Sequence, residues 1–201
     1  MRIALLFLLA FGLLPATHAQ TRAPDELVKS VTNEVIEIVK HDKDIQAGNP
    51  RKAAALVQEK VLPHFDFTRM TALAMGPNWR KATSEQRTAL VDQFRTLLVR
   101  TYSTALTSYR DQVIDYKPLR MQPADTEVTV RSLVRQSGAQ AVNIDYSMEK
   151  LDTGWKVYDM AVGGVSLVTT YRDTFNTEVR NSGIDGLIKT LSEKNRQLAS
   201  N

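Results

Sequence analysis

Apolar residues recur every three or four positions in the first half of the chain, and they alternate with polar residues between about 113 and 162. The first spacing predicts amphipathic helices and the second predicts half-buried strands. Helical spacing returns afterwards, in a helix from Tyr171 to Asn181 that stops at Gly183 and in a last helix to about Leu198. The pattern therefore predicts three consecutive blocks: helices over 24–110, a sheet over 113–162 and C-terminal helices over 169–199.

The longest predicted helix begins after Thr83, because Thr83 and Gln86 have the spacing of a capping box, in which each side chain binds the other residue's backbone N–H. The helix is expected to contact apolar groups along most of its length. Its apolar positions fall three and four residues apart and share one face: Val91, Phe94, Leu98, Tyr102, Ala105 and Tyr109.

Earlier helices have start and stop signals of their own. Pro24 suits the first turn of a helix that runs to about Lys40, with Leu27, Val31, Val35 and Ile38 at helical spacing. Asn49 is a candidate N-cap for a helix that runs to about Leu62 and ends at Pro63. A short, very apolar helix is then expected over 65–75.

The two central strands are predicted to form an antiparallel hairpin with its turn at Ser137-Gly138. One face of this hairpin is apolar except at one serine: Val128, Val130, Ser132, Val134, Val142, Ile144, Tyr146 and Met148. A third strand follows over 155–162. One face of this strand is expected to carry Lys156, Tyr158, Met160 and Val162, and the other face is expected to carry Trp155, Val157, Asp159 and Ala161.

These blocks predict an α+β fold, with a twisted antiparallel sheet of about four strands covered by about five helices, nuclear-transport-factor-like in outline. The space between the two layers is either a filled apolar core or a hollow. A hollow with such walls would accept acyl chains. The periodicity alone does not distinguish these two interiors.

The N-terminus has the features of a secretory signal peptide over 1–19, with a short apolar run and small residues before the expected cleavage after Ala19. Residues 20–201 are expected to form a single domain. The chain has no Cys, so disulfides and thiol catalysis are excluded. Removal of the signal leaves 25 basic and 22 acidic residues, a net charge of +3 with no long basic block. Nucleic-acid binding is therefore not indicated. The signal peptide, the lack of Cys and the basic charge together indicate a periplasmic location.

Few residues suggest catalysis. His41 and His64 have no spacing that matches a metal site, and no nucleotide-binding loop is present, so no cofactor is expected. Ser166 is interpreted as structural, because the glycine that a nucleophile elbow needs two positions later is replaced by Val168. Asp159 leaves one enzymatic alternative, a nuclear-transport-factor-like enzyme with this carboxylate as the base for an apolar substrate. A filled-core periplasmic interaction module is the other alternative.

Several residue strings resemble the MlaC family, also called the toluene tolerance family. They extend in order over essentially the whole chain after the signal: Val61-Leu62-Pro63-His64-Phe65-Asp66-Phe67-Thr68, Ala74-Met75-Gly76, Trp79-Arg80, Phe94-Arg95, Trp155-Lys156-Val157-Tyr158-Asp159-Met160, Gly164-Val165-Ser166-Leu167-Val168 and Gly183-Ile184-Asp185-Gly186. The chain has Gly163 where family members often have Glu.

The resemblance implies a soluble, monomeric, non-enzymatic periplasmic carrier that holds a phospholipid with its tails inside. Such a carrier exchanges lipid with an outer-membrane lipoprotein complex and with an inner-membrane ABC transporter and its periplasmic substrate-binding ring, in a system that maintains outer-membrane asymmetry. The predicted tail contacts are Phe94, Leu98, Tyr102, Val130, Val142, Ile144, Tyr146, Met160, Val162, Val165 and Leu167. The residues predicted to flank the pocket mouth or to meet a partner are Trp79, Arg80, Lys81 and Arg87.

Overall fold

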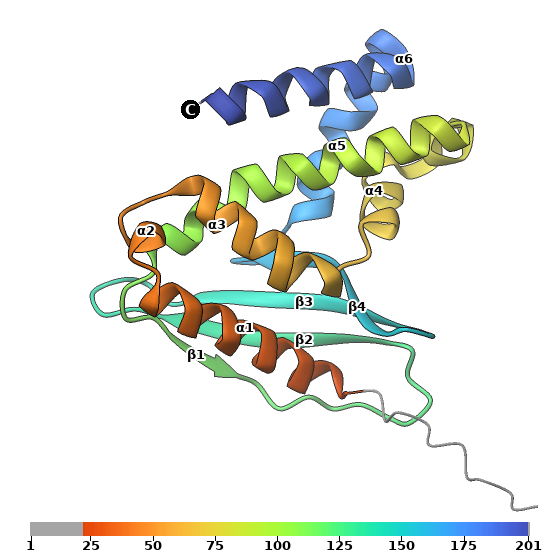
Figure 1. Cartoon of the computed structure of the whole chain (residues 1–201). Coiled ribbons are helices and arrows are strands. Elements are labelled where there is room, and N and C mark those ends of the chain that lie inside the picture. Colours follow the sequence, from red (N-terminus) through yellow and green to blue (C-terminus); the bar gives the residue numbers. More distant parts are fainter. Residues whose placement is uncertain (1–21, 201) are drawn as a thin grey trace, which may run out of the picture.

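A computed structural model describes residues 22–200. The predicted signal peptide lies outside these residues. The fold is α+β, as predicted, with a helical layer packed on one antiparallel sheet (Figure 1). No helix within residues 22–200 combines the length and the apolar character needed to cross a membrane.

The helical elements before the sheet are α1 (Pro24–His41), α2 (Lys43–Gln46), α3 (Pro50–Leu56), the π turn η1 (Val57–Val61), the 3-10 turn η2 (Leu62–His64), α4 (Phe67–Met75), the 3-10 turn η3 (Gly76–Lys81), α5 (Ser84–Tyr102) and the 3-10 turn η4 (Ser103–Ser108). The strands are β1 (Val113–Tyr116), β2 (Glu127–Arg135), β3 (Val142–Leu151), β4 (Gly154–Val162) and β5 (Val165–Ser166), and α6 (Leu167–Ser200) follows.

The predicted helix starts are confirmed by their hydrogen bonds. Thr83 and Gln86 form the capping box of α5 in both directions. Asn49 accepts the backbone N–H groups of Arg51 and Lys52 at the start of α3. The short α2 was not predicted, and Asp42 caps it through two backbone N–H groups.

Two helices end earlier than predicted. The helix predicted over 50–62 becomes a π turn after Leu56. In a continuous α-helix the ring of Pro63 would clash with the carbonyl of Glu59, four residues earlier. The long helix was expected to reach Tyr109 but becomes a 3-10 turn after Tyr102. In this segment threonine hydroxyls compete with backbone N–H groups for the carbonyl oxygens. The Thr107 hydroxyl, for example, donates to the carbonyl of Thr104 at 2.7 Å.

The sheet has five strands in the order β1-β2-β3-β4-β5, each antiparallel to its neighbour. One more strand than expected is present because the two residues of β5 pair with the end of β4. The predicted β2–β3 hairpin is confirmed, and Val130 lies opposite Tyr146 and Val128 opposite Met148. Its apolar face is therefore continuous across both strands.

The predicted face assignment of β4 is wrong because of a β-bulge. Met148 of β3 pairs with Val157, whereas the preceding Ser147 pairs with Asp159, so Tyr158 is an extra residue in β4. The extra residue shifts the side-chain alternation by one position. Val157 and Met160 therefore lie on the same face of the sheet, the face that packs against the helices.

The C-terminal helices are continuous in sequence but bent at one glycine. Gly183 has φ 72° and ψ −177°, a conformation that disfavours a side chain, and the chain reverses there so that the last part of α6 lies beside α5 (Figure 1). The predicted stop at Gly183 is thus confirmed. The first part of α6 begins at Leu167, earlier than the predicted Tyr171.

Three apolar clusters hold the layers together. One joins α4, α5 and α6 around Phe94 and Phe175, whose ring centroids are 5.1 Å apart. A second joins α1 to the sheet through Val28 and Met148. The third joins α1, α2 and α3. The three clusters leave a space where they meet.

Candidate functional site

An apolar pocket of about 270 Å³ occupies the space between the helices and the sheet. The interior is therefore hollow, which answers the question that periodicity left open. The pocket is lined by Leu27, Val28, Val31, Thr32, Val35, Val57, Val61, Leu62, His64, Phe65, Phe67, Met70, Leu98, Val99, Tyr102, Ser103, Leu106, Tyr146, Met148, Val157, Met160 and Leu167.

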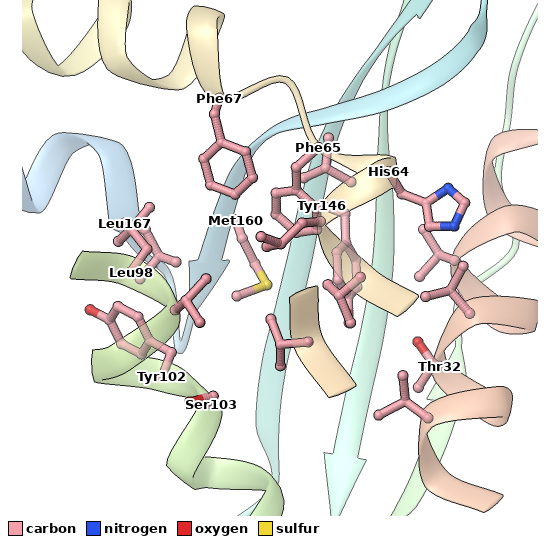
Figure 2. Close-up of a pocket in the computed structure, with 18 of the residues that line it drawn as sticks. Thr32, His64, Phe65, Phe67, Leu98, Tyr102, Ser103, Tyr146, Met160 and Leu167 are labelled. Carbon is pink, nitrogen blue, oxygen red and sulfur yellow. The ribbon is translucent and has the colours of Figure 1, made fainter. Parts of the chain in front are cut away.

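The walls come from elements far apart in the sequence. Figure 2 shows Leu98 and Tyr102 of α5 on one side and Thr32 of α1 on the other, with Tyr146 and Met160 of the sheet between them. Tyr102 is 38% exposed although it lines the pocket, so the pocket reaches the surface near the end of α5.

Among residues 22–200, no carboxylate, lysine or arginine lines the pocket. Its ionisable base is His64, whose pKa is lowered by burial and, to a smaller extent, by the positive charges of Lys156 and Arg22. This histidine is therefore neutral at neutral pH. A pocket with these walls binds hydrocarbon and offers no charge that would pair with a phosphate group.

The model of the family described as MlaC protein matches residues 29–193. The chain belongs to the MlaC family. The resemblance inferred from the residue strings is thus confirmed, and it extends over both the helical layer and the sheet that form the pocket.

Similar proteins come from three bacteria. The toluene tolerance protein ttg2D of Pseudomonas putida is 28% identical over 192 residues, which cover 95% of this chain and 87% of that protein. The intermembrane phospholipid transport system binding protein MlaC of Haemophilus influenzae is 21% identical, over 96% of this chain and 92% of that protein. A solved structure of a phospholipid-binding protein from Ralstonia solanacearum, in complex with a phospholipid, is 41% identical with a TM-score of 0.82. The match covers 89% of this chain and 99% of the Ralstonia solanacearum chain.

Five of the eleven tail contacts predicted for this MlaC-family chain lie in the pocket wall: Leu98, Tyr102, Tyr146, Met160 and Leu167. The other six are not part of the lining. Phe94 and Val130 are buried in the neighbouring apolar clusters, and Ile144 is half-buried. Val142, Val162 and Val165 are exposed at the end of the sheet, with Val165 61% exposed. Contact of any of the eleven with lipid stays a prediction.

The four residues predicted for the pocket mouth or for a partner lie at the opposite end of α5. Arg87 is eleven residues from Leu98, which corresponds to about 16 Å along the helix axis. Its guanidinium lies 5.3 Å from the ring centroid of Trp79 and donates to the Trp79 carbonyl. Arg80 and Lys81 are exposed on η3. None of the four lines the pocket, and a place beside its mouth or in contact with a partner stays a prediction for them.

Sequence reasoning missed the contribution of α1 and of η1. Leu27, Val31 and Val35 were recognised as one helical face, and the structure shows that this face is a pocket wall. The π turn η1 directs Val57 and Val61 to the same space. Helical spacing identifies an apolar face but does not show whether the face meets a filled core or a hollow.

Asp159 is held by hydrogen bonds outside the pocket. Its carboxylate accepts the hydroxyl of Ser166 at 2.6 Å and the backbone N–H of Val168 at 3.1 Å, and Ser166 in turn accepts the N–H of Thr169. These bonds satisfy the first N–H groups of α6. They explain the early start of α6 and give Ser166 the structural role that was predicted. Asp159 does not line the pocket, so the geometry does not favour it as a catalytic base.

Proposed function

We propose that this protein is a periplasmic phospholipid carrier that shields the acyl chains of its cargo in the pocket between α1, α5 and the sheet. The observation that carries the proposal is the apolar, charge-free lining of that pocket. It is supported by the likeness to the Ralstonia solanacearum protein, whose solved structure is described as a complex with a phospholipid.

The energy of such binding comes from the tails. Each buried CH₂ group contributes about 0.8 kcal/mol, so about ten buried CH₂ groups contribute about 8 kcal/mol, which corresponds to a Kd of about 1 μM. The phosphate is excluded from the pocket because no lysine or arginine lines it. The headgroup therefore remains in water, and the carrier discriminates weakly among headgroups.

We further propose that the carrier exchanges lipid with an outer-membrane lipoprotein complex and an inner-membrane ABC transporter with its periplasmic substrate-binding ring, and so helps to maintain outer-membrane asymmetry. The relative from Haemophilus influenzae supports this step, since it is named as part of an intermembrane phospholipid transport system. Water offers the released tails no favourable environment. Release therefore depends on a partner that binds an opened form of the pocket more tightly.

A transfer assay tests the carrier function. Protein loaded with a fluorescent phospholipid is mixed with the lipid-free periplasmic domain of the ring protein from the same bacterium, and the two are separated. We expect part of the lipid to move from the carrier to the ring domain during the incubation. In a control in which buffer replaces the ring domain, the lipid should remain on the carrier. Lipid that stays on the carrier in the presence of the ring domain would contradict the proposal.

A further inference from the structure

Hydroxyl groups gather at one place in the otherwise apolar interior, between α1 and the sheet. Thr32 of α1 and Tyr146 of β3 line the pocket, and both are drawn in Figure 2. Tyr116 of β1 and Ser132 of β2 are paired neighbours in the sheet, and Tyr116 packs against the same apolar cluster as Tyr146. Four hydroxyls from four separate elements therefore meet beside one wall of the pocket.

These hydroxyls do not satisfy one another fully. Ser132 donates to the carbonyl of Ile144 at 3.2 Å, so its proton is committed to the sheet. The Tyr116 hydroxyl is buried and has no partner at hydrogen-bond distance among the described residues. An unpaired buried hydroxyl is unfavourable, and structures seldom retain one that nothing ever satisfies.

The protonation of the two phenols makes them donors. Burial raises the pKa of Tyr146 to about 12 and also raises the pKa of Tyr116, while the neighbouring Thr32 hydroxyl acts in the opposite direction on both. Both phenols therefore carry their protons at any physiological pH. They are neutral O–H donors. Among residues 22–200 no lysine or arginine lines the pocket, and the nearby Lys29 lies outside the lining, with its Nζ 5.7 Å from the ring centroid of Tyr116.

Neutral donors in a charge-free pocket match a neutral acceptor. In a glycerophospholipid the acceptors that adjoin the tails are the ester carbonyl oxygens, whereas the phosphate is charged and remains in water. We propose that Thr32 and Tyr146, supported by Tyr116, form a subsite that donates hydrogen bonds to an ester carbonyl of the bound lipid. The proposal rests on the phospholipid-carrier function. It places the headgroup beside α1, where Thr32 is half-buried, and the tails towards Leu98 and Tyr102 of α5.

Such a subsite makes the protein selective for ester-linked lipids. A dialkyl ether phospholipid has the same headgroup and the same tails but lacks both carbonyl oxygens. One or two hydrogen bonds of ordinary strength correspond to an ester preference of about threefold to tenfold. An apolar pocket that recognises only tails would bind the two lipids equally.

The test compares dipalmitoyl phosphatidylethanolamine with its dihexadecyl diether analogue in competition for the delipidated protein, with bound lipid measured by mass spectrometry. We expect the wild-type protein to prefer the ester lipid by about threefold to tenfold. In the variants Tyr146→Phe and Thr32→Val, which remove a hydroxyl and preserve shape, the preference should fall towards one. Tyr158→Phe, on β4 outside the pocket lining, is the matched control and should keep it.

The outcomes separate the two proposals. Equal binding of ester and ether lipid by the wild-type protein, or an undiminished preference in Tyr146→Phe, would overturn the subsite and leave the carrier function standing. Failure to bind either lipid would overturn the carrier function itself. Thermal unfolding of each variant confirms that a lost preference does not reflect a lost fold.

Discussion

The substitution Val31→Trp should remove most of the bound phospholipid and leave the protein folded. Val31 lies on the pocket face of α1 and is half-buried, so an indole at this position projects into the hollow between α1 and the sheet. There it takes the place of part of an acyl chain. If three or four CH₂ groups are excluded at about 0.8 kcal/mol each, the affinity falls about a hundredfold.

The measurement is the amount of phospholipid that co-purifies with the variant. Val113→Trp is the control, because Val113 is an exposed valine on β1 that does not line the pocket. We expect Val113→Trp to retain the wild-type lipid content. Circular dichroism and thermal unfolding show whether both variants keep the fold. A Val31→Trp protein that is folded and still carries a full complement of lipid would show that the tails lie elsewhere.

The substitution Arg69→Gln should lower the free energy of unfolding of the protein. Arg69 of α4 donates to Glu149 at 2.6 Å and to Glu127 at 2.7 Å, and its guanidinium lies 3.6 Å from the ring centroid of Tyr158. It thus links the helical layer to three strands. Glu127 and Glu149 pair directly across β2 and β3, so removing Arg69 leaves two carboxylates facing each other.

The expected loss is about 2 kcal/mol, which is below the value for a fully buried pair because Arg69 and Glu127 are partly exposed to water. For a domain of this size it corresponds to a decrease in Tm of about 4–8 °C. Arg131→Gln is the matched control, since Arg131 lies 3.8 Å from Asp145 with its side chain 56% exposed, and should change the stability by less than about 0.5 kcal/mol. A second substitution, Glu127→Gln, should recover part of the stability lost in Arg69→Gln.

The effect of Arg69 should depend on pH. Hydrogen bonding from Arg69 lowers the pKa of Glu127 below its usual 4.5 in the folded protein. A carboxyl whose folded pKa is lowered contributes stability above its unfolded pKa, and this contribution is lost as the pH falls through the folded pKa. The difference in Tm between the wild type and Arg69→Gln should therefore narrow below pH 4.5. A difference that is constant from pH 7 to pH 3 would contradict the ion-pair account.

Local signals in the sequence predicted most of the fold. The capping box at Thr83, the β2–β3 hairpin and the helix break at Gly183 depend on residues close together in the chain, and all three are confirmed. The bulge at Tyr158 was not predicted, because an extra residue in a strand is visible only in its pairing with the neighbouring strand.

The pocket was harder to predict than the fold. Leu98 and Met160 were predicted as tail contacts from the resemblance to the MlaC family, and both are in the lining. Phe94 has the same helical spacing but is buried against Tyr171 and Phe175. The difference depends on where the first part of α6 packs, which the sequence of α5 does not reveal. Arg69 was not noticed for a similar reason, since its partners are 58 and 80 residues away.

The most direct test of the central claim is organic extraction of the protein after purification from a bacterial periplasm, followed by quantitative mass spectrometry of the extract. The account predicts about one phospholipid molecule per protein, with several headgroups represented and ester-linked tails throughout. A folded protein whose extract contains no stoichiometric lipid, and which takes up none when incubated with phospholipid, would contradict the claim that the pocket between α1, α5 and the sheet is a site for acyl chains.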